Sequence, residues 1–415
     1  MIKTQRVVVT GMGAVTALGC DLATIKKNLH EATCGIRPIT LFDHETLPVH
    51  VAGEALNFDP GTYLDSKEVR RNDRFIQMAL ASASQALEDA GLIGSPLLEQ
   101  AGVVVGVGLG GLSTIEKAHG DLLATGQDRI SPFFIPSVLS NLASGQISIK
   151  FKIKGPNFSV SSACASGSQA IGQAFHDIKH GRRRLWIAGG AEAAISPLGI
   201  SGFSASRALS KNTGDVKTLS KPFHPDRDGF VLGEGAGMLI LESLESAESR
   251  GAKIYGEILG YGISSDGYHV TSPDPEGTGA FTAMAEAIQE ADISVSEIDY
   301  VNAHATSTQV GDSIEVLSIQ KILGDQSSKT FVSSTKNLTG HPCGSAGSIE
   351  SVFCLTMMNA NHLSPAEYLE GLSQEDFPFL VPTVQRQPLQ IQTLVNNSFG
   401  FGGVNTALVF KKFIS

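Results

Sequence analysis

Short apolar runs rich in β-branched residues alternate along the chain with longer stretches of helical periodicity. The runs Val7–Val9 and Val103–Val105 contain no polar residue, which is typical of strands buried on both faces of a sheet. Strands that alternate with helices predict a layered α/β architecture. We expect strands at Arg6–Thr10, Ala101–Gly106, Asn157–Val160, Leu185–Ala188, Met238–Leu241, Ile254–Leu259, Tyr300–Asn302, Thr330–Ser333, Thr393–Asn396 and Ala407–Phe410, and helices at Asp73–Ala90, Ser166–His180, Gly279–Ala291, Asp312–Leu323 and Ser345–Asn359.

The second half of the chain echoes the first. An apolar run with spaced glycines opens each half, as VVVTGMGAVTALG and as IYGEILGYGISSD. Later, VSSACASGSQAIG is matched by VSSTKNLTGHPCGSAGSIE, each with a strand, two serines, a reactive side chain and a small-residue helix start. Self-similarity of this length predicts a duplicated domain. We expect halves at 1–251, with the cysteine, and 252–415, with the histidines, packed as one body.

Composition and charge exclude several functional classes. The 415 residues carry a net charge of −10, and 17% of them are charged, against about 25% in an average domain. This composition excludes disorder, and the acidic balance predicts no nucleic-acid partner. No apolar run reaches the roughly 18 residues of a membrane span, and Gly11 and Gly13 interrupt the N-terminal run, which favours a strand over a signal peptide. Five cysteines are scattered without a CxxC pair, which argues against disulfides and against a metal site. The same pattern predicts a cytoplasmic location.

Cys164 is the first candidate for chemistry. It lies in FSVSSACASGSQAIGQAF, where a strand ends, a turn follows and a helix begins at small residues. A helix start stabilises a thiolate by about 0.3–1 kcal/mol, whereas lowering a thiol pKa from about 8.5 to about 7 requires roughly 2 kcal/mol. The helix start and one imidazole would together be sufficient. The alternative is a small buried core residue, the more frequent role of a free cysteine.

Two histidines and a lysine occupy similar positions. His304 lies in DYVNAHATSTQVGD, and Lys336 and His341 lie in VSSTKNLTGHPCGSAGS, each just past a predicted strand. Ligand sites of α/β proteins lie at strand ends. Each histidine alone is more often structural. Taken with Cys164, the three segments predict one shared crevice.

Glycines surround Phe401 in the segment NNSFGFGGVNTALVF. Gly400, Gly402 and Gly403 permit positive φ and close backbone approach. Such a segment suits a mobile gate, or backbone N–H groups directed at an oxyanion. A plain glycine turn is the alternative.

A second glycine-rich segment, GVVVGVGLGGLS, contains the GxGxxG spacing at Gly106, Gly108 and Gly111. A dinucleotide fold needs a following helix and then a second strand that ends in an acidic residue about 20 positions on. The sequence offers no such strand. We therefore expect no nicotinamide site here.

Six segments, in this order, resemble the β-ketoacyl-[acyl carrier protein] synthases of the thiolase superfamily, most closely the type II elongating enzymes. They are VVVTGMGAVTALG, SSACASG, PFHPDRDGFVLGEGAG, NAHATST, SSTKNLTGH and NSFGFGGVN, and they span nearly the whole chain. The Cys–His–His set resembles the elongating class, since initiating and chalcone-type enzymes use Cys–His–Asn.

The resemblance implies a five-layered αβαβα fold and a homodimer. It also implies a decarboxylating condensation in fatty acid biosynthesis, in which Cys164 carries an acyl group as a thioester. His304 and His341 would donate hydrogen bonds from Nε2–H to the enolate oxygen, which requires neutral imidazoles of fixed tautomer. Lys336 would support the site together with Glu350.

The resemblance further implies that backbone N–H groups of Cys164 and Phe401 form an oxyanion hole. No metal or organic cofactor is needed, because the acyl carrier protein brings its own phosphopantetheine arm. Thr306 and Thr308 would bind that arm, Phe401 would gate the acyl tunnel, and Leu109 would reach across the dimer interface. The implied substrate-binding positions are Leu109, Phe203, Thr306, Thr308, Gly400 and Gly402.

A net acidic chain needs a local basic surface to bind an acidic carrier protein. The segment SKEVRRNDRF supplies the basic residues Lys67, Arg70, Arg71 and Arg74, and the resemblance places docking on the first three. The alternative is a solvated helix face. The implied docking residues are Lys67, Arg70, Arg71 and Arg207.

Several positions near the motifs depart from the family pattern, so two alternatives stay open. One is a specialised polyketide-type ketosynthase, and the other is a chain-length-factor-like partner subunit, although such partners lack the nucleophile. Thiolase-type chemistry would need a second cysteine within a different motif. The departures are Ala305, Gln309, Val310, Pro342, Cys343 and Val404.

Overall fold

A computed structural model describes residues 4–126, 130–369, 372, 377–382 and 389–414. In this part of the chain ten strands form one mixed sheet in the order β10-β9-β11-β12-β8-β1-β7-β6-β4-β5. A separate pair, β2 and β3, lies apart from it. The strands are β1 (Val7–Thr16), β2 (Arg37–Pro38), β3 (Val51–Ala52), β4 (Gly102–Gly106), β5 (Asn157–Val160), β6 (Leu185–Glu192), β7 (Gly235–Ser243), β8 (Gly256–Ser265), β9 (Tyr300–Asn302), β10 (Phe331–Ser333), β11 (Thr393–Gly400) and β12 (Val404–Lys411).

The sheet consists of two half-sheets with the same strand order. From the outer edge inward, each half uses its third, second, fourth, fifth and first strand in chain order. The halves meet where β1 pairs with β8 through Val7–Val9. The similarity between the two halves of the sequence therefore corresponds to a shared strand order. The domain boundary at 251/252 stays a prediction.

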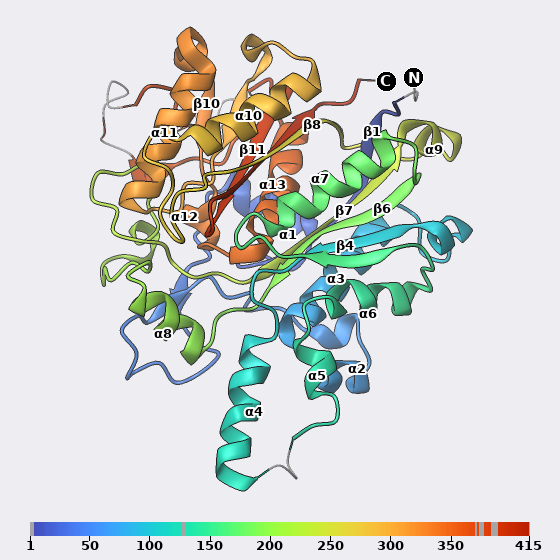
Figure 1. Cartoon of the computed structure of the whole chain (residues 1–415), viewed down its shortest axis with the longest axis vertical. Helices are drawn as coiled ribbons and strands as arrows, with labels where there is room; N and C mark the ends of the chain where they lie inside the picture. Colours follow the sequence, from blue (N-terminus) through green and yellow to red (C-terminus); the bar gives the residue numbers. More distant parts are fainter. Residues whose placement is uncertain (1–3, 127–129, 370–371, 373–376, 383–388, 415) are drawn as a thin grey trace.

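Helices form three layers around the two half-sheets (Figure 1). The central helices α7 and α13 pack on each other and on strands of both halves, α3 and α6 cover the outer face of the N-terminal half, and α10 covers that of the C-terminal half with α11 beside it. Each of the three helix layers packs on an apolar core of its own, and the central core spans both half-sheets. The helices are α1 (Leu22–His30), α2 (Ser66–Arg71), α3 (Arg74–Asp89), α4 (Leu112–Thr125), α5 (Phe134–Val138), α6 (Leu142–Phe151), α7 (Ser166–Lys179), α8 (Pro197–Ala205), α9 (Leu244–Ser249), α10 (Thr278–Ala291), α11 (Gln309–Leu323), α12 (Lys336–Thr339) and α13 (Ala346–Ala360).

The glycines that open each half allow a helix to approach the strand closely. A Cβ atom at Gly13 of β1 would overlap the carbonyl oxygen of Ser82 in α3. A Cβ atom at Gly262 of β8 would overlap that of Ala283 in α10. The spaced glycines therefore have the same role in both halves, because only glycine allows the helix backbone to lie this close to the strand.

Each of the ten strands expected from the apolar runs is present, and several are longer than expected. β1, for example, continues to Thr16. The five expected helices also occur, within a few residues of the expected bounds. Helix α4 is not among these five. It projects away from the body (Figure 1) and has no buried residue. Within the described residues, no helix has the length and apolar character that crossing a bilayer requires.

Candidate active site

Cys164 lies on a tight turn between β5 and the central helix α7. Ala163 before it has a φ of +50°, a left-handed conformation that costs a non-glycine residue energy. Ser166 holds the turn, because its Oγ accepts from the backbone N–H of Ser162 at 2.9 Å and donates to the carbonyl of Ala163 at 2.6 Å. The small residues of this segment thus form a turn that presents the thiol at the helix start.

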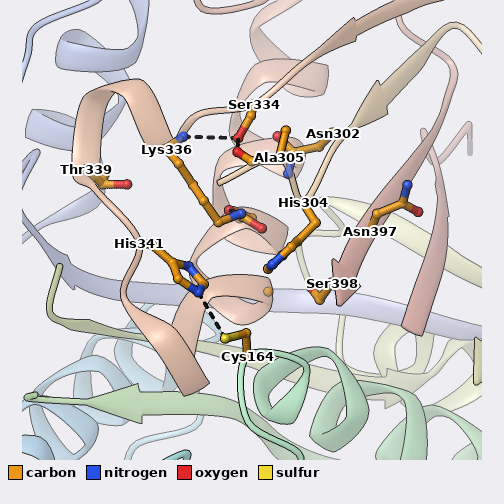
Figure 2. Close-up of polar contacts among 12 residues, drawn as sticks. Cys164, Asn302, His304, Ala305, Ser334, Lys336, Thr339, His341, Asn397 and Ser398 are labelled. Carbon is orange, nitrogen blue, oxygen red and sulfur yellow. Dashed lines mark hydrogen bonds and ion pairs between the residues drawn. The ribbon is translucent and has the colours of Figure 1, made fainter. Parts of the chain in front are cut away.

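Both predicted histidines lie beside this cysteine (Figure 2). His341 Nε2 lies 3.0 Å from Cys164 Sγ. The ring of His304 stands nearly perpendicular to that of His341, at 86° and with 5.3 Å between centroids. The structure therefore brings into one crevice three side chains that are up to 177 residues apart in sequence.

The loop that carries His304 is fixed by Glu315 of α11. This buried carboxylate accepts from the backbone N–H groups of His304 and Ala305 at 2.8 and 2.7 Å, and from Asn397 Nδ2 at 3.1 Å. Burial raises the pKa of Glu315 to about 7, against the effect of these donors. Sequence analysis missed Glu315, because the one available signal was an acidic residue eleven positions after His304 within a predicted helix.

Lys336 and Glu350 form an ion pair deep inside the molecule, with 1% and 2% of their surfaces exposed. Burial, together with the nearby Lys336 ammonium, holds the pKa of His304 and of His341 well below the usual range. Both imidazoles are therefore neutral at physiological pH. Within the described residues the Nδ1 atoms of both rings have no hydrogen-bond partner, whereas His341 Nε2 shares a hydrogen bond with Cys164 Sγ.

The thiol of Cys164 is not acidic in the absence of a ligand. Burial raises its pKa to about 12, although the Lys336 ammonium and the backbone N–H groups of Phe401 and Cys164 act in the opposite direction. The expected pKa near 7 is wrong, because the helix start and one imidazole do not outweigh burial of the charge. A thiolate must instead form as a proton leaves for a neighbouring base, and His341 Nε2 is in place to accept it.

A cavity of about 370 Å³ connects this crevice to the surface. Gly400 packs so closely on the turn before Cys164 that a Cβ atom would lie 2.6 Å from the carbonyl oxygen of Ser162. Gly402 has a φ of +86° and lies outside the lining. The predicted site residues that line the cavity are Cys164, Phe203, Arg207, His304, Thr306, Thr308, His341, Gly400 and Phe401.

The remaining predicted residues lie elsewhere. Leu109 is 48% exposed, on the loop between β4 and α4. Lys67, Arg70 and Arg71 belong to α2, and the two arginines line a separate hollow. There the Arg71 guanidinium lies over the ring of Phe133, 4.3 Å from its centroid. Of the four predicted docking residues, only Arg207 lines the catalytic cavity of this chain.

Solved ketosynthases share this fold. A β-ketoacyl synthase from Burkholderia phymatum matches with a TM-score of 0.91 and 33% identity, over 99% of this chain and 100% of that one. A type II polyketide synthase ketosynthase in complex with its acyl-carrier protein, bound to the hexaketide, matches with a TM-score of 0.89 and 28% identity, over 99% and 100%. By class, the chain is a ketosynthase of thiolase-like α/β fold.

Sequence comparison gives the family. The family models for the β-ketoacyl synthase N-terminal and C-terminal domains match residues 4–247 and 255–369. The 3-oxoacyl-[acyl-carrier-protein] synthase 2 of Staphylococcus aureus strain COL is 45% identical over 414 residues, which cover 100% of both chains. The chain belongs to the β-ketoacyl synthase family.

Proposed function

We propose that this protein is an elongating 3-oxoacyl-[acyl carrier protein] synthase of fatty acid biosynthesis. It condenses an acyl group on Cys164 with malonyl-[acyl carrier protein] and releases CO2 and a 3-oxoacyl chain two carbons longer. The observation that carries the proposal is the 3.0 Å approach of His341 Nε2 to Cys164 Sγ, with His304 perpendicular to the same ring. The 45% identity to a 3-oxoacyl-[acyl-carrier-protein] synthase 2 supports it.

Acyl transfer comes first. Cys164 Sγ attacks the carbonyl carbon of the incoming thioester while its proton passes to His341 Nε2. The backbone N–H groups of Cys164 and Phe401, which both act on the Cys164 sulfur, donate to the oxygen that becomes negative. The carbon–sulfur bond to the phosphopantetheine arm then breaks, and the leaving thiolate takes the proton from His341.

Condensation follows when malonyl-[acyl carrier protein] enters. Loss of CO2 leaves an electron pair shared between the α-carbon and the thioester oxygen, and His304 and His341 donate to that oxygen from Nε2–H. The carbanion attacks the acyl carbonyl, the carbon–sulfur bond to Cys164 breaks, and the thiolate takes a proton from solvent that enters the open cavity. His341 needs an Nε2 lone pair in the first stage and an Nε2–H in the second. Between the stages the ring therefore loses its Nδ1 proton to solvent and gains one from solvent at Nε2.

The surface supports the proposed partners. Edge strand β5 and the adjoining α4 and α5 segments expose large apolar side chains: Leu109, Leu123, Phe133, Ile135 and Phe158. A second copy of the chain would cover them, so we propose a homodimer. Arg207 at the cavity mouth and the basic residues of α2 would receive acidic carrier protein. Five free cysteines fit a cytoplasmic location.

The test is intact-protein mass spectrometry after mixing the enzyme with acyl carrier proteins that bear C4 to C18 chains. Wild type should gain the mass of the acyl group, and the Cys164→Ala variant should not. Malonyl carrier protein should discharge the adduct and yield a product two carbons longer. An adduct on both proteins, or none at any length, contradicts the proposal. A parallel reaction uses oxo-substituted chains of the same lengths, and an adduct only with these would identify a polyketide-type enzyme instead.

A further inference from the structure

The glycine-rich segment after β4 binds an anion that belongs to the chain itself. The backbone N–H groups of Gly108, Leu109 and Gly110 donate to the carboxylate of Glu192, at distances between 2.9 and 3.2 Å. Gly344, from the other half of the molecule, donates to the same carboxylate at 3.1 Å. Glu192 ends β6 and is fully buried. The backbone N–H groups of a segment with the GxGxxG spacing thus bind a carboxylate of the chain itself.

The close approach of both loops requires glycine. A Cβ atom at Gly108 would overlap Glu192 Oε2, and one at Gly344 would lie 2.7 Å from the same oxygen. Four N–H donors also require a group that only accepts, which an ionised carboxylate is and a protonated carboxyl group is not. No cation is paired with this carboxylate among the ion pairs of the described residues. Backbone dipoles therefore stabilise its charge.

Glu192 connects the two loops that flank the nucleophile. Gly344 is three residues past His341, whose Nε2 contacts Cys164, and Leu109 leads into the projecting α4. Gly344, which donates to Glu192, directly follows Cys343, and Cys343 lines the same cavity as Cys164. After burial and the opposing Lys336 ammonium, the Glu192 carboxylate is the next influence on the pKa of Cys164, which it raises. The other ionisable groups that line the cavity around Cys164 are Arg207, Asp228, Asp266, His304, His341 and Cys343.

We propose that Glu192 is a positioning residue, whose carboxylate fixes the His341 loop against the Leu109 loop and places a negative charge behind the cavity that holds Cys164. The proposal rests on the proposed function for its effect on condensation. Its effect on Cys164 is independent of any acyl substrate.

Two measurements on Glu192→Gln test the two parts. The first is the pH profile of Cys164 alkylation by iodoacetamide, followed by peptide mass spectrometry. Its midpoint should fall by about one pH unit, so that alkylation below the midpoint is about tenfold faster. The second is the rate of condensation, whose kcat should fall by up to about 100-fold, the cost of an approximately 1 Å displacement in an active site, with the KM for acyl carrier protein unchanged.

The matched control is Glu242→Gln. Glu242 is also fully buried, but it lies in β7 and binds Arg250. This control should lower the melting temperature and leave both the alkylation midpoint and kcat at their wild-type values. A merely structural role for Glu192 would give the same result as the control.

Glu192→Asp keeps the charge and shortens the side chain, so its kcat should fall while the alkylation midpoint stays at the wild-type value. If Glu192→Gln does not fold, this variant still tests the positioning role. Wild-type kcat in a folded Glu192 variant overturns the positioning role. An unchanged midpoint in Glu192→Gln overturns the effect of charge. If the wild-type enzyme itself fails to condense, the proposed function is wrong, and the alkylation experiment still decides the effect of charge.

Discussion

Replacing Lys336 by methionine should destabilise the protein strongly. Lys336 and Glu350 are almost fully buried and paired with each other. Within the described residues the second oxygen of Glu350 has no hydrogen-bond partner. Lys336→Met would therefore leave a buried carboxyl group with no cation. Removing one partner of a buried pair costs about 3–5 kcal/mol, whereas replacing both by apolar groups of similar volume is often neutral.

The double variant Lys336→Met/Glu350→Leu separates charge burial from the loss of a lysine side chain. It should recover most of the stability that Lys336→Met loses. Trp186, the only tryptophan of the chain, reports unfolding, because it is 3% exposed in β6 and its ring lies 5.8 Å from that of Phe158. Urea unfolding followed by its fluorescence, at one protein concentration, measures both changes.

The double variant should nevertheless stay inactive in condensation. Burial lowers the pKa of His304 and of His341 most, and the Lys336 ammonium lowers it further; no apolar pair replaces this second effect. Two results would refute the interpretation of Lys336 and Glu350 as a coupled buried pair. One is a decrease of less than about 1 kcal/mol in the free energy of unfolding of Lys336→Met, and the other is a double variant no more stable than the single one. Normal condensation by the double variant would refute the role of the ammonium.

Three further outcomes follow from the charges. Reversal of Arg70 and Arg71 to Glu should raise the KM for carrier-protein substrates, and an unchanged KM removes α2 from the docking surface. Despite partial burial, hydrogen bonds from a histidine and a lysine of α7 lower the pKa of Glu290 to about 2. This contribution to stability is present above the unfolded-state pKa of about 4.5 and is lost as the pH falls towards 2; Glu290→Gln should lose less stability in acid unfolding over that interval. Condensation should weaken below about pH 7, where Glu315 and Glu192 gain protons, and a pH–rate profile flat well below 7 would contradict this.

The strands, and the meeting of Cys164, His304 and His341 in one crevice, were predicted for a physical reason. Buried strands read as apolar runs at any position in the chain, and each of the three residues follows such a run. Around α4 the sequence indicated only a polar helix–loop stretch without defined bounds, because its apolar residues, such as Leu122 and Leu123, face solvent in the single chain and show no core-facing pattern.

The two buried carboxylates beside the site were missed for a different reason. Glu192 binds backbone N–H groups up to 152 residues away, and Glu315 binds those of His304 and Ala305. Backbone donors leave no mark in the residue types of their segments, apart from glycines with many other uses. The wrong expectation for the thiol of Cys164 has a related origin, because burial depends on every element around the cavity and not on the local helix start.

Charged groups have two different roles at this site: one acts on the imidazoles, and the others hold the loops. Lys336 is the cation that acts on both imidazoles, and its own partner is Glu350. Glu192 and Glu315 hold the histidine loops through backbone N–H groups instead of cations. Burial raises the pKa of both carboxyl groups to about 7, while the pKa values of the imidazoles lie far lower. As the pH falls, Glu192 and Glu315 are therefore protonated before His304 and His341. We therefore expect the chemistry proposed for Cys164 to depend on protons bound by Glu192 and Glu315, which do not line the cavity around Cys164.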